Sequence, residues 1–499
     1  MLNEFPKVTI LLFALLISLL KPQGLNSKAS GNSIPKTTNS SDSIKTEIIK
    51  NGWSDHFLSS FQYYLVNSDA PAEKDQEEVS NIPDGYRKAF LRSILLMKEN
   101  KFKEMYDTLE SHLNEAPRYL PYYDELVYSA NATNRLSVPG SKTETLPNFP
   151  QREKNYLLGL IKYNSADYKS AKEFFKNCLT ADSTDKYVLY QLSYTYRSLG
   201  DYKSALSFIK KAEEYTRDDL NFNVKCTLAE GALYFLSGEY DLADKIYKES
   251  FSLSSKNELR ECEGLSYVAL GIMADAQGII KSAREEYSKA LEIAGTIQNV
   301  DLKAYALSEL GVSYSYTNEL IEAKENYLDS YKLFKATGNK LRLSLLSDNI
   351  GKVYMSIFNY DAAIKYYKEG IEFAGDYKRA LILNLTGLGD AYSNLANYSE
   401  ALKYYNQARK LSAEINEIEL SININSGLGA LNYNLNRSEN ALTYYQKADS
   451  ECAKINNPFL TSDIYDKLGN IYLSLDSLNV AENYFRQSLN LSQKSNAQY

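Results

Sequence analysis

Apolar positions in the later two-thirds of the chain follow two periods, one short and one long. Within residues 151–495, apolar side chains recur at i, i+3, i+4 and i+7, the spacing that gives a helix one buried stripe. On the longer scale, an alanine recurs every 34–40 residues, and a large apolar or aromatic residue follows it four positions later. The alanines are Ala171, Ala205, Ala243, Ala283, Ala323, Ala363, Ala401, Ala441 and Ala481. This pattern predicts a series of similar helical units.

A small residue stands twelve positions before each alanine. It is glycine in eight units and serine in the second: Gly159, Ser193, Gly231, Gly271, Gly311, Gly351, Gly389, Gly429 and Gly469. Only a small side chain lets two successive helices, A and B, come close where they cross, and the aromatic ring then fills the space beside the crossing. Because one such hairpin cannot bury its apolar face alone, we expect the units to stack on their neighbours.

These units resemble the tetratricopeptide repeat (TPR). The best copies are LGVSYSYTNELIEAKENY (310–327) and LGDAYSNLANYSEALKYY (388–405), and the resemblance covers about residues 151–495 in nine repeats, mostly of 38–40 residues. It implies an all-α fold, a right-handed α–α superhelix (a TPR solenoid) of stacked antiparallel helix pairs. The family's proline at the end of helix B is missing, and the period exceeds the usual ~34 residues. We therefore expect longer helices and a longer turn from B to A.

The rest of the chain divides into shorter segments. Residues 84–136 have the same two-helix rhythm and are interpreted as a degenerate N-terminal repeat or cap. Residues 137–150 contain three prolines and are expected to form a loop, whereas residues 30–83 are expected to be a flexible linker with a short helix. Residues 496–499 are expected to form a tail. Without a polar capping helix after the ninth repeat, the last apolar face could self-associate or bind a partner.

The N-terminus has the features of an export signal. Its apolar run, Val8–Leu20, has 13 positions, which suits the core of a signal peptide better than a membrane-spanning helix of about 20 residues. Small residues at Ser27 and Ala29 predict cleavage before Ser30, so that residues 1–29 are removed. The alternative is an uncleaved anchor. The expected location is the periplasm, the cell envelope or the outside of a cell, and the composition suggests a bacterial source.

Composition narrows the function classes. A net charge of −7 argues against a nucleic-acid partner, and two histidines are too few for a multi-histidine metal site. No phosphate-binding glycine loop, zinc-protease or nucleophile-elbow motif is present in the sequence, so we expect no enzyme, no cofactor and no metal. The four cysteines form no C-x-x-C pair and are expected to be small buried residues.

With these classes set aside, the sequence favours a protein that binds a peptide or another protein. In the family, helix A lines the concave face of the superhelix, which gives groove candidates by position, aromatic towards the N-terminal end and polar to acidic towards the C-terminal end. The candidates are Tyr156, Tyr163, Tyr187, Tyr190, Tyr194, Arg197, Asp348, Lys352, Asp390, Asn394, Asn423, Asn434, Asp466 and Asn470. Tyrosine rings and amides suit a peptide ligand, although these tyrosines could instead pack between adjacent helices.

The leading hypothesis is a non-enzymatic, exported scaffold that binds a protein or peptide in its concave groove. A second hypothesis is a sensor or regulatory ectodomain held at a membrane by an uncleaved N-terminal segment. A third, an enzyme carried on residues 31–150, rests on a stretch without any catalytic motif.

Overall fold

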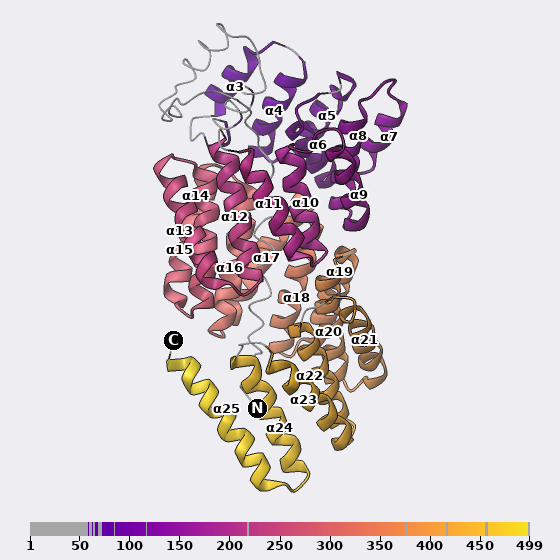
Figure 1. The fold of residues 1–499 in the computed structure, drawn as a ribbon, viewed down its shortest axis with the longest axis vertical. Helices are drawn as coiled ribbons and strands as arrows, with labels where there is room; N and C mark the ends of the chain where they lie inside the picture. The colour runs from indigo at the N-terminus through magenta and orange to yellow at the C-terminus, as the bar shows by residue number, and fades with distance from the viewer. Residues whose placement is uncertain are drawn as a thin grey trace.

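The protein is all-helical in the part of the chain described by the computed structural model. That part comprises residues 58, 62, 65–67, 72–83, 85–115, 117–216, 219–375, 377–415, 418–454 and 458–497, and it contains no strand. The predicted signal at 1–29 and most of the predicted linker at 30–83 lie outside it. Helix pairs follow one another along the chain and wind into an elongated right-handed superhelix, with the N-terminal helices at one end and α24 and α25 at the other (Figure 1).

Several helices with described bounds precede the first regular repeat. They are α3 (Ala72–Ser80), α4 (Tyr86–Lys98), α5 (Phe102–Glu110), α6 (Pro121–Ala132) and α7 (Val138–Thr145). The last of these lies where the prolines predicted only a loop. Pro139 stands in its first turn, where a missing backbone N–H breaks no helical hydrogen bond, so proline starts this helix instead of preventing it.

Nine helix pairs then form the solenoid. The inner helices, A, are α8 (Gln151–Asn164), α10 (Lys186–Ser198), α12 (Leu220–Leu236), α14 (Arg260–Ala276), α16 (Val300–Tyr316), α18 (Lys340–Ser356), α20 (Lys378–Asn394), α22 (Ile418–Asn434) and α24 (Pro458–Ser474). The outer helices, B, are α9 (Tyr168–Leu179), α11 (Tyr202–Glu214), α13 (Tyr240–Lys256), α15 (Ile280–Thr296), α17 (Leu320–Thr337), α19 (Tyr360–Ala374), α21 (Tyr398–Ser412), α23 (Ser438–Cys452) and α25 (Leu478–Ala497).

The extra residues of the longer repeats lie in the helices. Helices α12 to α16 have 17 residues each, whereas α8 has 14 and α9 has 12. The expectation of a longer B-to-A turn is wrong: residues 257–259 separate α13 from α14, whereas residues 180–185 separate α9 from α10. Adding residues to both antiparallel helices lengthens their shared contact and leaves the turn short.

The predicted crossing of A and B at a small residue is confirmed. A Cβ atom built on Gly311 would lie 2.7 Å from the Tyr327 ring, and one on Gly389 would lie 2.6 Å from the Tyr405 ring. In the second repeat Ser193 takes the glycine position, and its hydroxyl donates a hydrogen bond to the Ala205 carbonyl at 2.8 Å. Each ring therefore occupies the volume that a larger residue on helix A would need.

Every A-to-B turn uses one left-handed residue, five positions before the alanine. It is glycine in three repeats, at Gly200, Gly238 and Gly278, and another residue in six: Ala166, Asn318, Phe358, Ala396, Asn436 and Asp476. Asparagine and aspartate adopt this conformation more readily than other side chains, whereas Phe358 does so at φ 60° with 70% of its surface exposed. The A-to-B turn thus keeps the same left-handed backbone conformation even in repeats that lack glycine at this position.

The superhelix completes a coil and touches itself. Helix α6 packs against α17, and the Asn131 amide donates a hydrogen bond to the Gly338 carbonyl at 2.5 Å. The Tyr168 and Tyr377 rings meet edge to face with centroids 6.2 Å apart. These contacts join residues more than 200 positions apart, so the interior is enclosed on this side.

The four cysteines lie in the core of the described helices. Cys178, Cys226, Cys262 and Cys452 are buried and free, which confirms their predicted role as small core residues. Among the described residues, no helix combines the length and the apolar character needed to cross a bilayer.

Candidate functional site: the interior of the superhelix

The enclosed side of the coil surrounds a small cavity, which we call the inner cavity. Its volume is about 90 Å³, and its wall combines residues of α6 and the first two repeats with residues of the fifth and sixth repeats. The lining residues are Asp124, Val127, Tyr128, Asn131, Leu160, Tyr163, Asn164, Ala166, Tyr168, Gln191, Tyr194, Asp301, Thr337, Asn339, Lys340 and Leu341. Tyrosines, amides and carboxylates dominate this wall, so it can offer both ring faces and hydrogen-bonding groups to a ligand.

A hydrogen-bonded network fixes one part of the wall. The Tyr156 hydroxyl donates to Asp124 Oδ2 at 2.9 Å, and the Gln191 amide donates to Asp124 Oδ1 at 3.0 Å. The three residues come from α8, α6 and α10, so the network ties the N-terminal cap to the first two repeats. Such a network holds lining side chains in one arrangement before any ligand arrives.

The N-terminal groove candidates divide between the cavity and the core. Tyr163 and Tyr194 line the inner cavity. Tyr156, Tyr187 and Tyr190 are buried among neighbouring helices, and burial raises the pKa of each phenol well above its ordinary value. For these three, the alternative that they pack between helices describes their position. As partner-binding residues, all five stay a prediction.

Arg197 lies beside the cavity wall. It is 4% exposed, and its guanidinium stands over the ring of Tyr194 with Cζ 4.9 Å from the centroid. Neither terminal nitrogen has a hydrogen-bond partner within the described part of the chain. An unsatisfied buried guanidinium is unusual in a packed protein.

The C-terminal candidates lie away from the inner cavity, along α18 to α24. Asp348 is buried and pairs with Lys352, and burial raises its pKa above the ordinary value. Asp390 accepts a hydrogen bond from the Tyr405 hydroxyl at 2.5 Å, and burial raises its pKa to about 6. Asn423 is half-buried. The other four, Asn394, Asn434, Asp466 and Asn470, are exposed.

Several cavity residues could not be found from the repeat pattern. Asp124, Tyr128 and Asn131 come from α6, which precedes the repeats, so no repeat position points to them. Asn339 ends a B-to-A connection and Lys340 begins α18, and both reach the cavity because the coil closes. The prolines around residues 117–121 signal the start of a helix but nothing about its neighbours.

Two further acids lie buried in the interior, on α14 and α16. Burial raises the pKa of Asp275 to about 7, although hydrogen bonds from Tyr287 and Ser313 favour its charged form. Burial likewise raises the pKa of Glu309 to about 8, against the attraction of Arg342. Both acids therefore change charge near neutral pH.

This gives a pH-dependent stability. A carboxyl group whose pKa is raised from 4.5 to about 8 binds its proton more tightly in the folded state, so it destabilises the fold progressively as pH rises through this range. We expect Glu309→Gln to match the wild type at pH 5 and to raise the free energy of unfolding by about 1–3 kcal/mol at pH 8.5. Urea unfolding at both pH values measures the difference. Glu325→Gln, on an exposed side chain, is the control, and an equal gain at pH 5 would contradict the prediction.

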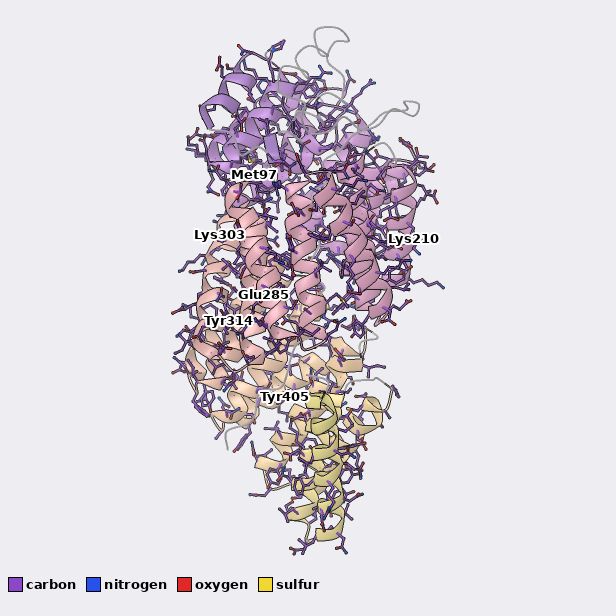
Figure 2. All side chains as sticks on the ribbon, turned by 90° about the vertical axis from the view of Figure 1, so that its left-hand side faces the viewer. Met97, Lys210, Glu285, Lys303, Tyr314 and Tyr405 are labelled. Atoms are coloured by element: carbon purple, nitrogen blue, oxygen red, sulfur yellow. The ribbon has the colours of Figure 1, made fainter. Side chains whose placement is uncertain are left out.

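The outer surface has a different character. Charged side chains cover the B helices, including exposed Lys210 on α11 and Glu285 on α15 (Figure 2). Within the described ranges, no group of three or more His, Cys, Asp or Glu side chains is arranged to hold a metal ion. The interior is therefore the part of the described structure that combines a cavity with buried polar groups.

Stacked antiparallel pairs with a closed coil define the chain as an α-solenoid. Family profiles for the tetratricopeptide repeat match residues 341–414 and, separately, residues 155–185, 187–219 and 462–495. These matches fall on the helix pairs described above, so the chain contains tetratricopeptide repeats at these residues.

Three known proteins are similar to this chain in sequence or fold. A TPR repeat-containing protein of Methanocaldococcus jannaschii is 24% identical over 253 residues, which are 46% of this chain and 42% of that protein. A Rap protein, solved in complex with competence and sporulation factor, has a TM-score of 0.51 at 12% identity, covering 72% of this chain and 100% of its own. The apo quorum sensor NprR from B. thuringiensis gives 0.47 at 14% identity, covering 67% and 96%.

Proposed function

We propose that this protein is a non-enzymatic scaffold that binds a short peptide, or an extended segment of a protein, inside its superhelix. The observation that carries the proposal is the inner cavity, whose wall brings together side chains from α6, α8, α10 and the start of α18. The Rap protein, which shares the fold, was solved with a bound factor, and this supports a ligand in a solenoid of this kind.

The chemistry of the wall suits a peptide. Tyr163 and Tyr194 offer large ring faces that lose little conformational entropy on binding. Asn164 and Gln191 carry amides, which can pair with a peptide backbone. At about 90 Å³ the cavity is smaller than a peptide, so binding requires the coil to widen around the ligand.

Export is the second part of the proposal, because the apolar run Val8–Leu20 has the length of a signal-peptide core. The alternative, an anchored sensor ectodomain, needs the same segment to be retained. N-terminal sequencing of the exported protein separates the two: a first residue near Ser30 supports the exported scaffold, and an intact N-terminus in the membrane fraction supports the anchored sensor.

Filling the inner cavity tests the binding site. Asn164 lines the cavity on α8, and its amide makes only an intrahelical hydrogen bond, to the Leu160 carbonyl at 2.9 Å. Peptides that bind the wild type are first selected from a random library. We expect Asn164→Trp to lower the affinity for these peptides by at least about tenfold, because the indole ring occupies the space that they need. Fluorescence anisotropy with the selected peptides measures the loss.

The matched control is Asn326→Trp on the outer helix α17. Asn326 makes the same kind of intrahelical bond, to the Glu322 carbonyl at 2.8 Å, and is not among the residues that line the cavity. Unchanged affinity in both variants would contradict the interior as the binding site, and a library that yields no peptide would contradict peptide binding itself.

A further inference from the structure

Arg197 and Arg342 place two buried guanidinium groups in the interior. Arg197 stands in the last turn of α10 and Arg342 in the first turn of α18, four repeats further along the chain. They are 4% and 1% exposed. Arg342 is held over the rings of Tyr305 and Phe334, with its Cζ 4.1 and 5.7 Å from their centroids. Such aromatic faces stabilise a buried guanidinium.

The two positive charges act on each other. Burial lowers the pKa of Arg342 to about 10, Tyr305 and Glu309 oppose this shift, and the charge of Arg197 adds to it. Both terminal nitrogens of Arg197 lack a hydrogen-bond partner in the described ranges, and no described carboxylate forms an ion pair with this residue. Arg197 is thus a buried cation without its own counter-ion.

Glu309 neutralises the two buried positive charges only in part. Its Oε1 atom is buried without a hydrogen bond, and the influence of its charge falls on Arg342. Its pKa of about 8 leaves much of it protonated at neutral pH. A buried charge that lacks a partner costs several kcal/mol, and a sequence that keeps one without gaining stability indicates a group with a binding role.

The position of Arg197 connects this charge to the cavity. Its guanidinium covers Tyr194, and Tyr194 lines the inner cavity. Arg342 follows directly on Leu341, which lines the same cavity from α18. Neither arginine is itself among the lining residues, but both adjoin them, so a ligand that widens the coil would meet positive charge at the boundary between α10 and α18.

We propose that Arg197 binds an oxyanion of the ligand, a carboxylate or a phosphate, and that Arg342 adds a second positive charge to this subsite. The inference rests on the proposed function, because the cavity ligand brings the oxyanion. The planar fork of a guanidinium matches both oxyanions with two parallel hydrogen bonds, which makes arginine the appropriate side chain. The two arginines come from repeats 2 and 6, so this subsite exists only while the coil is closed.

Stability without ligand is the first measurement. Arg197→Met keeps the apolar bulk over Tyr194 and removes the charge, so the full-length variant is expected to melt at or roughly 1–3 °C above the wild type. Arg486→Met, on an exposed arginine paired with Glu482, is the matched control and is expected to leave the melting temperature unchanged. A fall of more than roughly 3 °C in Arg197→Met would show that Arg197 stabilises the fold and would overturn the proposal.

Binding is the second measurement. Peptides selected from the random library are compared as free acids, as C-terminal amides and with Asp and Glu replaced by their amides, and inorganic phosphate is tested as a competitor. We expect Arg197→Met to lower the affinity for the free-acid peptide about 10–100-fold. A peptide whose relevant oxyanion has been replaced by an amide is expected to bind wild type and variant with equal affinity. The peptide form or competitor that abolishes the difference in affinity between wild type and Arg197→Met identifies the oxyanion as a terminal carboxylate, a side-chain carboxylate or a phosphate.

Failure of the subsite is distinguishable from failure of the proposed function. Peptides that bind wild type and Arg197→Met equally overturn the oxyanion subsite and leave the scaffold proposal standing. If the library yields no peptide, the scaffold proposal fails. In that case a rise in melting temperature with phosphate that requires Arg197 supports the subsite, and the absence of such a rise overturns it too.

Discussion

Gly389→Ala is expected to lower the free energy of unfolding by about 1–3 kcal/mol, although alanine is the better helix former. The added Cβ would lie 2.6 Å from the Tyr405 ring, and Gly427 of the next repeat confines the same ring from the other side at 2.5 Å. Tyr405 cannot move aside, because its hydroxyl is also held by Asp390. Urea unfolding followed by circular dichroism measures the loss.

The control for this prediction is the same substitution where nothing is in contact. Gly295 lies near the end of α15, and a Cβ atom there would meet no atom within 4 Å. Gly295→Ala is expected to stabilise the protein by about 0.5–1 kcal/mol, since alanine restricts the unfolded chain and favours the helix. Two substitutions identical in chemistry thus have opposite expected signs. A gain in both variants would contradict packing of the Tyr405 ring against Gly389.

Glu261→Ala is expected to cost about 3–5 kcal/mol, the larger of the two effects. Glu261 on α14 is 6% exposed and accepts a hydrogen bond from the fully buried Lys225 of α12 at 2.6 Å. The amide of Asn299 reaches its other oxygen at 3.2 Å. Removing the carboxylate leaves an ammonium group in the core without a partner, which urea unfolding would report as a lower midpoint.

A double variant tests whether the charge is the cause. Lys225→Met combined with Glu261→Leu replaces the pair by apolar groups of similar length, and is expected to recover most of the lost stability. Glu482→Ala, which breaks an exposed pair with Arg486 on α25, is expected to change stability by less than about 1 kcal/mol. Equal losses in Glu261→Ala and Glu482→Ala would contradict the argument from burial.

The local order of the repeats could be predicted because it is written in short-range spacing. Gly389 and Tyr405 are sixteen positions apart, and a helix hairpin brings two such positions together whatever the rest of the chain does. The same reasoning placed the small residues, the rings and the cysteines. It failed at Pro139, where one residue type can either start a helix or break it, and at the B-to-A turn.

The interior is less predictable, because it depends on the pitch of the superhelix. Asn131 meets Gly338 only after a full coil, and small rotations at each repeat add up to this meeting. Tyr156 and Tyr163 are about two turns apart on α8, yet Tyr163 lines the cavity and Tyr156 is buried in the core. Position on helix A thus predicted the inner side but not which residues face open space.

The meeting of α6 with α17 has a mechanical consequence. In an open solenoid each repeat contacts only its neighbours, so the repeats extend under tension independently of one another. Here the Asn131–Gly338 bond and the Tyr168–Tyr377 contact join two turns of the coil, so tension along the chain loads these contacts before it loads the repeats between them. Such a chain is expected to extend under force in two stages. The contacts between the turns of the coil break first, and the repeats between them then extend at lower force.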